Sequence, residues 1–520
     1  MTAMRPNGWG DPAQALVLPE PVRELLTQLL SLRPRDTRPV EIDRIPLPDP
    51  VLPAGLTDEL AGVVGPAGVH TGPSQRLAHT RGKSTVDLLR MRRGDATDAP
   101  DAVVCPGSHD EVLAVLSLCA EQRVAVVPFG GGTSVVGGLT PARSGFAGVV
   151  ALDLSRLDRL TTVDPVSRTA ELEAGVTGPA AERLLGEHGF TLGHYPQSFE
   201  FATIGGFAAT RSSGQFSLAY GRFDEMVVGL RVATPSGTVS LGRAPRSAAG
   251  PDLRQLFLGS EGTLGVITAV TVAIRPLPPG RQVKAWRFAS FDDGVAALRA
   301  VVQSDGPRPT MARLSDETET AVNAALEGRS AEPGCQLMVG YEGGADVHEL
   351  LSTMGGHVVA DGGAENWEAS RFRAPYLRDA LLDEGVLVET VETATFWSSL
   401  PALRTAVIDA LTTSLLADGT PPIVLCHVSH AYPTGGALYF TVACAQTDDP
   451  VAQWTRAKHA ATEAILASGG TVTHHHAVGV DHAEGLAEEI GPLGLDVLRA
   501  VKARLDPAGI LNPGILGLYT

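Results

Sequence analysis

The chain is short of cysteine and of continuous apolar sequence, and both shortages exclude classes of protein. Its five cysteines among 520 residues are odd in number and form no CxxC pair, which disfavours a zinc ribbon and a disulfide-stapled scaffold. Reduced thiols fit this pattern best, so we expect a cytoplasmic protein. No run of about eighteen apolar residues occurs, and residues 1–19 contain no apolar core, so the sequence predicts neither a transmembrane segment nor a signal peptide.

Positive charge is also in short supply. Lysine and arginine total 41 against 58 aspartates and glutamates, which gives a formal net charge of −17. A chain this acidic repels a nucleic-acid backbone, so we expect no nucleic-acid partner. An anionic substrate would have to be held by a few locally placed arginines.

The length alone predicts two or more domains, because one hydrophobic core does not extend over so many residues. Residues 1–95 are rich in proline and are interpreted as a wrapping segment. Residues 96–278 alternate apolar runs with glycine-rich turns, residues 279–450 mix strand-like and helical segments, and residues 451–520 are mainly helical. The apolar spacing predicts helices over 22–32, 110–121 and 454–467 and strands over 102–105, 123–128, 148–152, 169–172, 226–234 and 264–274.

Glycine is abundant, and its first cluster follows directly on a predicted strand. The segment PFGGGTS at 128–134 places three consecutive glycines before two hydroxyl donors. Such a turn lets the backbone approach a ligand closely and directs N–H groups at an anion such as a pyrophosphate. A plain flexible turn is the alternative. The spacing fits neither GxGxxG, since position 135 is Val135, nor a P-loop, since no lysine follows.

Two further glycine-rich segments lie downstream. Residues 195–214 (YPQSFEFATIGGFAATRSSG) intersperse serine, threonine and glycine with apolar side chains, which suits a loop wrapped round a flat ring system. Residues 259–267 (GSEGTLGVI) repeat this composition just before a predicted strand. Three such segments in one region indicate a large, partly anionic cofactor more strongly than any one of them.

In this order, the three segments resemble the FAD domain of the vanillyl-alcohol-oxidase (para-cresol-methylhydroxylase, PCMH) superfamily, and within it the alkyldihydroxyacetonephosphate synthase family. The resemblance covers nearly the whole chain and includes GWG at 8–10, RLSD at 313–316, YLRD at 376–379, ETATFW at 392–397, CHVSHAYPTGGALYF at 426–440 and GGTVTHHHAVG at 469–479. It implies an α+β fold, with a PCMH-type two-subdomain FAD-binding domain over 96–278 and an α+β substrate (cap) domain over 279–450. The C-terminal segment, 451–520, would return to the flavin site.

The resemblance also implies how the cofactor is held. Many relatives attach the flavin through a histidine in the first glycine-rich turn, where this chain has Thr133, so FAD is expected to bind non-covalently. The implied FAD contacts are Pro128, Phe129, Gly130, Gly131, Gly132, Thr133, Ser134, Gln197, Ser198, Phe199, Glu200, Phe201, Ala202, Thr203, Thr210, Arg211, Ser212, Ser213, Glu261, Gly262, Thr263, Leu264, Gly265, Val266 and Ile267. The implied partners are a small-molecule or lipid-like substrate and a second copy of the chain in a homodimer, with a peripheral membrane contact left open.

A histidine triplet, His474, His475 and His476, ends the strand-like segment TVTHHH. On a strand, the first and third of these would share one face and the second would point the opposite way. A metal site would need a further ligand, such as His482 or a carboxylate, and a mixture of core and surface histidines is another alternative. The resemblance instead implies that the triplet lies beside flavin and substrate, where histidine suits polarising a carbonyl or moving protons. We therefore predict no metal site.

Three more side chains enter through the resemblance. Tyr439 lies where the synthase family has an essential tyrosine, a candidate general acid/base, with a buried structural tyrosine as the alternative. Arg313 matches a family arginine that supports the active site, or else is a structural ion-pair partner. His427 departs from the pattern, because the family has an arginine there that helps hold the phosphate-bearing intermediate, and histidine is a weaker anion anchor.

The activity implied is the exchange of the acyl group of an acyl-dihydroxyacetone-phosphate for a fatty alcohol through a flavin N5 adduct, as in ether-lipid synthesis. Tyr439 would manage protons and the histidine triplet would steady the headgroup. The alternative is an FAD-dependent oxidoreductase that takes hydride from a hydroxy acid or alcohol, with His475 or Tyr439 as base, and the histidine at 427 favours it. A flavin-binding protein without activity is a third hypothesis, disfavoured because a mere binder would not need these polar groups.

Overall fold

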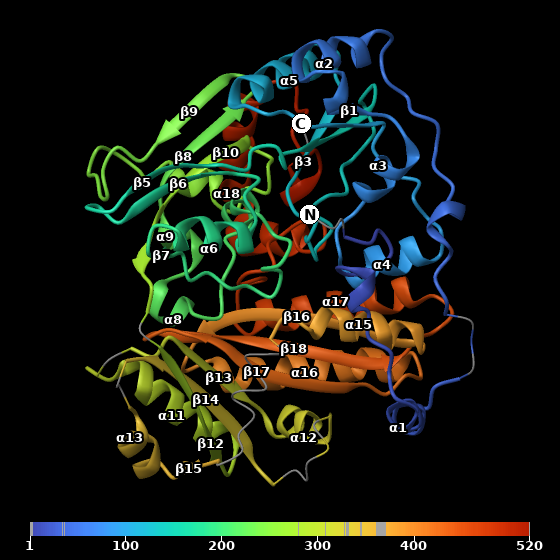
Figure 1. Cartoon of the computed structure of the whole chain (residues 1–520). Coiled ribbons are helices and arrows are strands. Elements are labelled where there is room, and N and C mark those ends of the chain that lie inside the picture. The colour runs from blue at the N-terminus through green and yellow to red at the C-terminus, as the bar shows by residue number, and fades with distance from the viewer. Residues whose placement is uncertain are drawn as a thin grey trace.

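The computed structural model describes residues 4–33, 35, 37–278, 280–306, 308–326, 328, 332–343, 346–359 and 371–518. Three sheets dominate the described chain: a four-stranded sheet and a five-stranded sheet in one half, and a seven-stranded sheet in the other (Figure 1). The N-terminal and C-terminal segments both connect the two halves (Figure 1).

The N-terminal segment runs from the seven-stranded sheet to the four-stranded one (Figure 1). The predicted helix over 22–32 is confirmed as α1, whose Leu30 is buried with Val386. Ser84 begins another helix, α4, by accepting the N–H of Asp87, the usual role of an N-cap serine. The helices of this segment are η1 (Pro12–Gln14), α1 (Glu20–Leu30), η2 (Ile42–Arg44), α2 (Leu56–Val64), η3 (Pro66–Gly68), α3 (Pro73–Ala78) and α4 (Thr85–Arg92).

The four-stranded sheet carries the first glycine-rich turn. Its order is β1-β2-β4-β3, with β2, β4 and β3 parallel and β1 antiparallel to β2. Helix α5 (His109–Glu121), capped by Ser108, connects β2 to β3, so the predicted strand–helix–strand unit before the turn is confirmed. The strands are β1 (Val69–His70), β2 (Ala102–Val104), β3 (Ala125–Phe129) and β4 (Val149–Asp153).

The five-stranded sheet is antiparallel, and the third glycine-rich segment leads directly into its central strand, on which the second segment packs. Its order is β5-β6-β10-β8-β9, and the strands predicted over 169–172, 226–234 and 264–274 are confirmed. The sequence did not reveal β5 and β9, because both are largely solvent-facing edge strands without an apolar run. The elements are β5 (Leu160–Asp164), β6 (Thr169–Glu173), α6 (Gly178–Gly186), β7 (Phe190–Thr191), α7 (Ile204–Ala209), α8 (Ser217–Tyr220), α9 (Phe223–Met226), β8 (Val227–Thr234), β9 (Gly237–Leu241), α10 (Arg254–Phe257), β10 (Val266–Ala273) and β11 (Arg275–Pro276).

The seven-stranded sheet is antiparallel, in the order β15-β12-β14-β13-β17-β18-β16. Its strands are β12 (Arg281–Phe288), β13 (Met311–Ser315), β14 (Cys335–Glu342), β15 (His357–Val358), β16 (Val386–Phe396), β17 (Ile423–Ala431) and β18 (Gly435–Ala445), and its helices are α11 (Phe291–Gln303), α12 (Glu317–Leu326), α13 (His348–Thr353), α15 (Ala374–Asp383) and α16 (Leu400–Ala417). Side chains alternate across a strand, so Leu314, Cys426 and Phe440 enter the core with α16 while their neighbours face the other half.

Helix α16 is long and apolar enough to cross a membrane, with a mean hydropathy of 1.2 over 18 residues. Its buried stripe belongs to the core of the seven-stranded sheet, where it also packs against α17 (Pro450–Ala467). The stripe consists of Leu400, Leu403, Val407, Leu411 and Leu415. Burial of this stripe is the pattern of a core helix.

The C-terminal segment returns to the first sheet (Figure 1). Helix α17 confirms the helix predicted over 454–467, and α18 (Ala483–Leu505) kinks at Gly491, directly before Pro492. Lys502 is buried and ion-paired with Asp506 at 2.6 Å, and its ammonium group also donates to the carbonyl oxygen of Thr263 at 2.9 Å. The end of the chain is thereby held against the third glycine-rich segment.

Candidate active site

A cavity of about 550 Å³ lies between the two halves, within the range of small-molecule sites. One wall, here called the glycine wall, is made by the three glycine-rich segments. Of the predicted FAD contacts, the wall contains Pro128, Phe129, Gly130, Gly131, Gly132, Thr133, Ser134, Gln197, Ser198, Ala202, Thr203, Thr210, Ser212, Ser213, Glu261, Gly262, Gly265, Val266 and Ile267. The other six predicted contacts are not among the lining residues: Phe199, Glu200, Phe201, Arg211, Thr263 and Leu264.

The first turn has to be glycine because it packs directly on the second segment. A Cβ on Gly130 would lie 2.5 Å from Oγ1 of Thr203, and one on Gly131 would overlap the carbonyl oxygen of Phe201. Gly132 has φ +66°, which a glycine adopts without strain. The turn and the loop therefore form one surface.

The donors of this turn are what an anionic cofactor requires. In the part of the chain that the structure describes, the backbone N–H groups of residues 130–134 donate to no protein oxygen. Backbone donors left free on a cavity wall form a cradle for a phosphate or pyrophosphate. The residues present thus fit FAD, with its pyrophosphate at the first turn.

The opposite wall, here called the catalytic wall, comes from adjacent strands of the seven-stranded sheet. His427 on β17 pairs with Tyr439 on β18, and their rings stack with centroids 5.0 Å apart. The Tyr439 ring also lies 6.0 Å from that of His475 and 5.5 Å from that of His476. Burial raises the pKa of Tyr439 to about 12, so the phenol keeps its proton at neutral pH.

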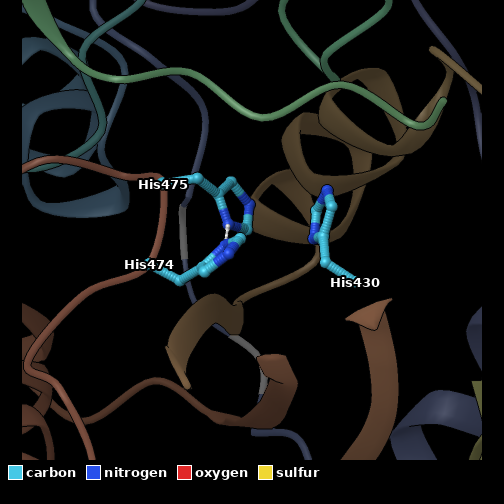
Figure 2. A group of neighbouring side chains, drawn as sticks. All are labelled: His430, His474 and His475. Carbon is cyan, nitrogen blue, oxygen red and sulfur yellow. Dashed lines mark hydrogen bonds between the residues drawn. The ribbon is translucent and has the colours of Figure 1, made fainter. Parts of the chain in front are cut away.

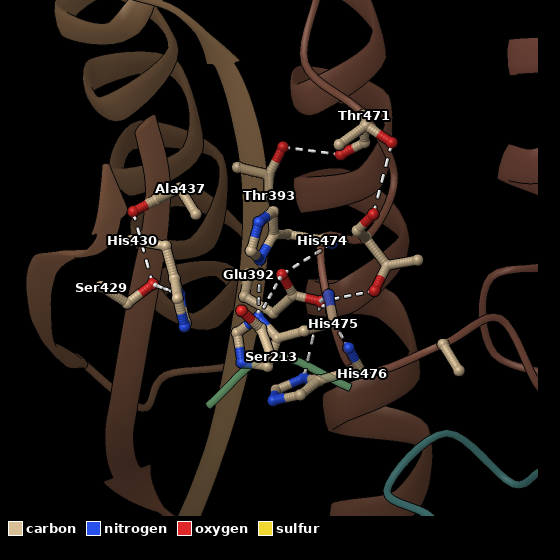
Figure 3. Close-up of polar contacts among 12 residues, drawn as sticks. Ser213, Glu392, Thr393, Ser429, His430, Ala437, Thr471, His474, His475 and His476 are labelled. Atoms are coloured by element: carbon tan, nitrogen blue, oxygen red, sulfur yellow. Dashed lines mark hydrogen bonds and ion pairs between the residues drawn. The ribbon is translucent and has the colours of Figure 1, made fainter. Parts of the chain in front are cut away.

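The histidine triplet does not lie on a strand, so that prediction is wrong. Residues 471–479 form a bent loop, because the buried carboxylate of Glu392 on β16 accepts the N–H groups that a strand would offer to a neighbour. It accepts from His474 at 2.7 Å, His475 at 3.1 Å and His476 at 3.0 Å, and from the Thr473 hydroxyl (Figure 3). The rings therefore gather round one carboxylate instead of alternating.

Two more carboxylates hold the same loop. One bonds the residue before the triplet region, and the other bonds the residues after it. Glu489 accepts the N–H of Val472 at 2.8 Å, before the triplet. Glu261, from the third glycine-rich segment, accepts the N–H groups of Val478 at 2.9 Å and Gly479 at 2.8 Å, after it. The loop is thus fixed to both halves of the molecule. The sequence of the loop does not indicate these hydrogen bonds, because all three carboxylates lie outside the loop along the chain.

The environment of the loop sets its protonation. Although burial raises the pKa of Glu392, the surrounding histidines hold it well below its ordinary value. Burial lowers the pKa of both His474 and His476 to about 3. These rings are therefore neutral at physiological pH, beside an ionised carboxylate.

His430 and Tyr432, which the sequence did not single out, join the triplet. Ligand nitrogens of His430, His474 and His475 all lie within 4.8 Å of one another (Figure 2). The Tyr432 hydroxyl lies 2.6 Å from Nε2 of His474, and Nδ1 of His430 lies 3.0 Å from the Ser429 hydroxyl. The third member of the cluster is thus His430, whereas His482, considered from the sequence, bonds the carbonyl oxygen of Ala477. The only signal in the sequence was their place in the motif CHVSHAY.

Arg313 and His427 both contact the buried carboxylate of Glu319. Oε1 of Glu319 lies 2.7 Å from Nη2 of Arg313 and 3.1 Å from Nδ1 of His427. Although burial raises the pKa of Glu319, the neighbouring His427 and Arg313 hold it well below its ordinary value. Burial, together with Arg313, lowers the pKa of His427. An ionised Glu319 beside one arginine and a neutral histidine leaves this corner without net positive charge.

One part of the cavity lining, here called the apolar arm, consists of apolar side chains. They come from α12, α15 and the strands of the seven-stranded sheet, and Leu326 among them is 56% exposed. The side chains of the arm are Met311, Val322, Leu326, Leu377, Val388 and Leu425. Such an arm suits the chain of a lipid-like substrate whose polar end lies at Tyr439.

Comparison with known proteins agrees with this geometry. Residues 100–241 match the FAD binding domain family, and residues 277–516 match the family of FAD linked oxidases, C-terminal domain. An alkyldihydroxyacetonephosphate synthase of Dictyostelium discoideum is 31% identical over 564 residues, covering 98% of this chain and 92% of that protein. A solved alkyldihydroxyacetonephosphate synthase superposes with a TM-score of 0.84 at 30% identity, covering 98% of each chain.

A more distant likeness extends to the wider fold. p-Cresol methylhydroxylase with substrate bound superposes with a TM-score of 0.66 at 17% identity, over 90% of this chain and 98% of that one. The predicted α+β, PCMH-type fold is therefore confirmed, and FAD is the cofactor of this chain.

Proposed function

Because the chain belongs to the alkyldihydroxyacetonephosphate synthase family of FAD enzymes, we propose that it exchanges the acyl group of an acyl-dihydroxyacetone-phosphate for a fatty alcohol. The observation that carries the proposal is the shape of the cavity. It joins the glycine wall to Tyr439 and His475 and also includes the apolar side chains of the arm, which suit a lipid chain. A flavin held by the glycine wall would supply an electrophilic ring for this reaction.

The residues of the catalytic wall divide the proton chemistry between them. Tyr439 keeps its proton at neutral pH, because burial raises its pKa to about 12, and it donates to oxygen on the substrate. His475 lies on the cavity wall and accepts the hydroxyl proton of the incoming alcohol. Glu392 fixes the loop that carries His475 and offers a negative charge beside its ring at 3.3 Å.

We further propose that FAD is bound non-covalently, because Thr133 provides no nucleophile of the kind that anchors a flavin. Four of the five cysteines are buried as free thiols, which suits a cytoplasmic location. A homodimer is proposed from the family resemblance, and a peripheral membrane contact would bring lipid substrates to the exposed part of the apolar arm.

A second candidate is an FAD-dependent oxidoreductase acting on a hydroxy acid or alcohol. The observation that favours it is the corner of Arg313, Glu319 and His427, which has no net positive charge to hold a phosphate dianion. In this reaction His475 would take the hydroxyl proton, and a bound flavin would supply the hydride acceptor.

The deciding experiment follows flavin absorbance of the purified protein without oxygen. Palmitoyl-dihydroxyacetone-phosphate is added in one cuvette, and hydroxy acids and alcohols in others. Bleaching by the acylated phosphate, with release of fatty acid and return of colour on adding hexadecanol alone, supports the exchange. Bleaching only by a hydroxy acid or alcohol, with colour restored only by an electron acceptor, contradicts the exchange and supports the oxidoreductase.

A further inference from the structure

One proton has to leave the buried site in each turnover if the function proposed above is right. The alcohol loses its hydroxyl proton, and the acyl group departs as a carboxylic acid that ionises. The oxidoreductase alternative also releases a hydroxyl proton. Because His474 and His476 have pKa values near 3, neither can store that proton at neutral pH. A path to solvent is required.

Three side chains form a hydrogen-bonded row that begins on the cavity wall. Nδ1 of His475 lies 3.0 Å from Nδ1 of His474 (Figure 2). Nε2 of His474 lies 2.6 Å from the hydroxyl of Tyr432. His475 lines the cavity, whereas His474 and Tyr432 lie behind it. Both nitrogens of His474 are engaged, one toward each neighbour, which is the arrangement by which an imidazole passes a proton. We propose that the row His475–His474–Tyr432 is the proton path of the active site.

The outer end of the row lies beside a charged turn of the FAD-binding half. Tyr432 is half-buried, on the connection between β17 and β18. Burial raises its pKa to about 12, and the charges of Arg222, Glu225 and Asp224 also act on its hydroxyl. Glu225 is exposed to solvent, so protons that reach this turn can exchange with water.

The transfers balance when each group gives up one proton as it gains another. Nε2 of His475 takes the alcohol proton while its Nδ1–H passes to Nδ1 of His474. The Nε2–H of His474 then passes to Tyr432, and the hydroxyl proton of Tyr432 leaves for solvent. Because the pKa of His474 is about 3, its doubly protonated ring is no resting state, and the two transfers through it are concerted. The starting tautomers return when the ring protons exchange with water between turnovers, because a reverse transfer along the row would carry the proton back to the site.

Glu392 is the counter-charge of this path. Its Oε2 lies 3.3 Å from Nδ1 of His475, so it stabilises positive charge passing through that ring. Its buried position protects that attraction from screening by salt. His430, in contrast, bonds Ser429 and lies to one side of the row.

The test compares Tyr432→Phe with Tyr341→Phe. Tyr341 is a matched control, since its hydroxyl is buried, has no hydrogen-bond partner among the residues that the structure describes, and lies on β14, outside the site. Flavin content and Tm are measured first. Single-turnover rates are then followed in H2O and D2O with whichever substrate bleaches the wild type.

We expect Y432F to slow the proton-dependent step roughly 10- to 100-fold with KM and flavin content unchanged, and to change the solvent isotope effect. Added imidazole should restore part of the rate by accepting the proton directly, and Y341F should match the wild type. A flavin-loaded Y432F with the wild-type rate and isotope effect would overturn the proposal. His474→Gln, which interrupts the row at its centre, gives the same readouts if Y432F loses its flavin. If only a hydroxy acid bleaches the wild type, the proposed acyl exchange is contradicted. The proton path is then tested with that hydroxy acid as substrate.

Discussion

The two walls of the cavity are built in different ways from the same chain. The glycine wall consists of three segments of consecutive residues. Their high glycine content indicates that the backbone packs closely there. The catalytic wall takes single side chains from β13, β17, β18 and the loop 471–479, which are far apart in sequence. The glycine wall therefore keeps its shape only where no side chain separates the packed backbones, whereas the catalytic wall depends on its buried charges. Substitutions in the two walls should fail in different ways.

The largest effect is expected at the glycine wall, from Gly131→Ala. A Cβ there overlaps the carbonyl oxygen of Phe201, so the first turn and the second segment cannot pack and the cradle for FAD is lost. We expect almost no bound flavin, measured as the ratio of flavin to protein absorbance after gel filtration. Gly62→Ala in α2 is the control, because its added Cβ meets no atom within 4 Å. A fully loaded G131A would contradict this account of the wall.

At the catalytic wall, Glu392→Gln should retain flavin and lose activity. The neutral amide weakens the hydrogen bonds from three N–H groups and removes the charge beside His475. Losing charge-assisted hydrogen bonds costs on the order of 2–3 kcal/mol, or about 100-fold in kcat.

The matched control for that variant is Glu489→Gln. Glu489 holds the same loop through Thr471 and Val472 and bonds none of the three histidines. Near wild-type activity in E489Q would assign the effect to the histidines. Equal losses in both variants would mean that the loop needs only general support.

Two of the three carboxylates that hold the loop, Glu261 and Glu392, should respond to pH with opposite signs. Burial raises the pKa of Glu261 to about 7, so its contribution to stability is lost as pH rises from about 4.5 through 7. The pKa of Glu392 is held below its ordinary value, so its contribution is lost as pH falls. Glu261→Gln should remove a loss of roughly 3 kcal/mol between pH 5 and pH 8. The measurement is thermal unfolding of the wild type and of E261Q across this pH range. Parallel curves of stability against pH would refute the prediction.

The smallest effect is expected from added Zn²⁺. Nitrogens of His430, His474 and His475 lie within 4.8 Å of one another, and neutral imidazoles are good zinc ligands. Zinc should inhibit reversibly, with a chelator restoring activity, and His430→Gln should raise the concentration needed about tenfold. His459→Gln, which changes an exposed histidine, is the control. Identical zinc sensitivity in both variants would count against this cluster.

Much of the glycine wall could be predicted because its signals are local. The order of the three segments carried the family resemblance, and of the 25 FAD contacts that the resemblance implied, 19 line the cavity. The loop at TVTHHH was predicted wrongly as a strand, since alternating residues suit a strand and Glu392 overrides that preference from β16. Edge strands β5 and β9 were missed because little of either is buried.

The FAD-binding fold, the family and most polar groups of the site could be predicted from the residue pattern, because glycine turns and buried strands depend on neighbouring residues. The charge of those groups and the bonds between them depend instead on contacts between distant segments. Glu319 neutralises Arg313, three carboxylates shape the histidine loop, and Tyr432 reaches His474 across 42 residues. These contacts join distant segments inside a low-dielectric interior, where charge and protonation depend on the atoms within a few ångströms and not on neighbours along the chain.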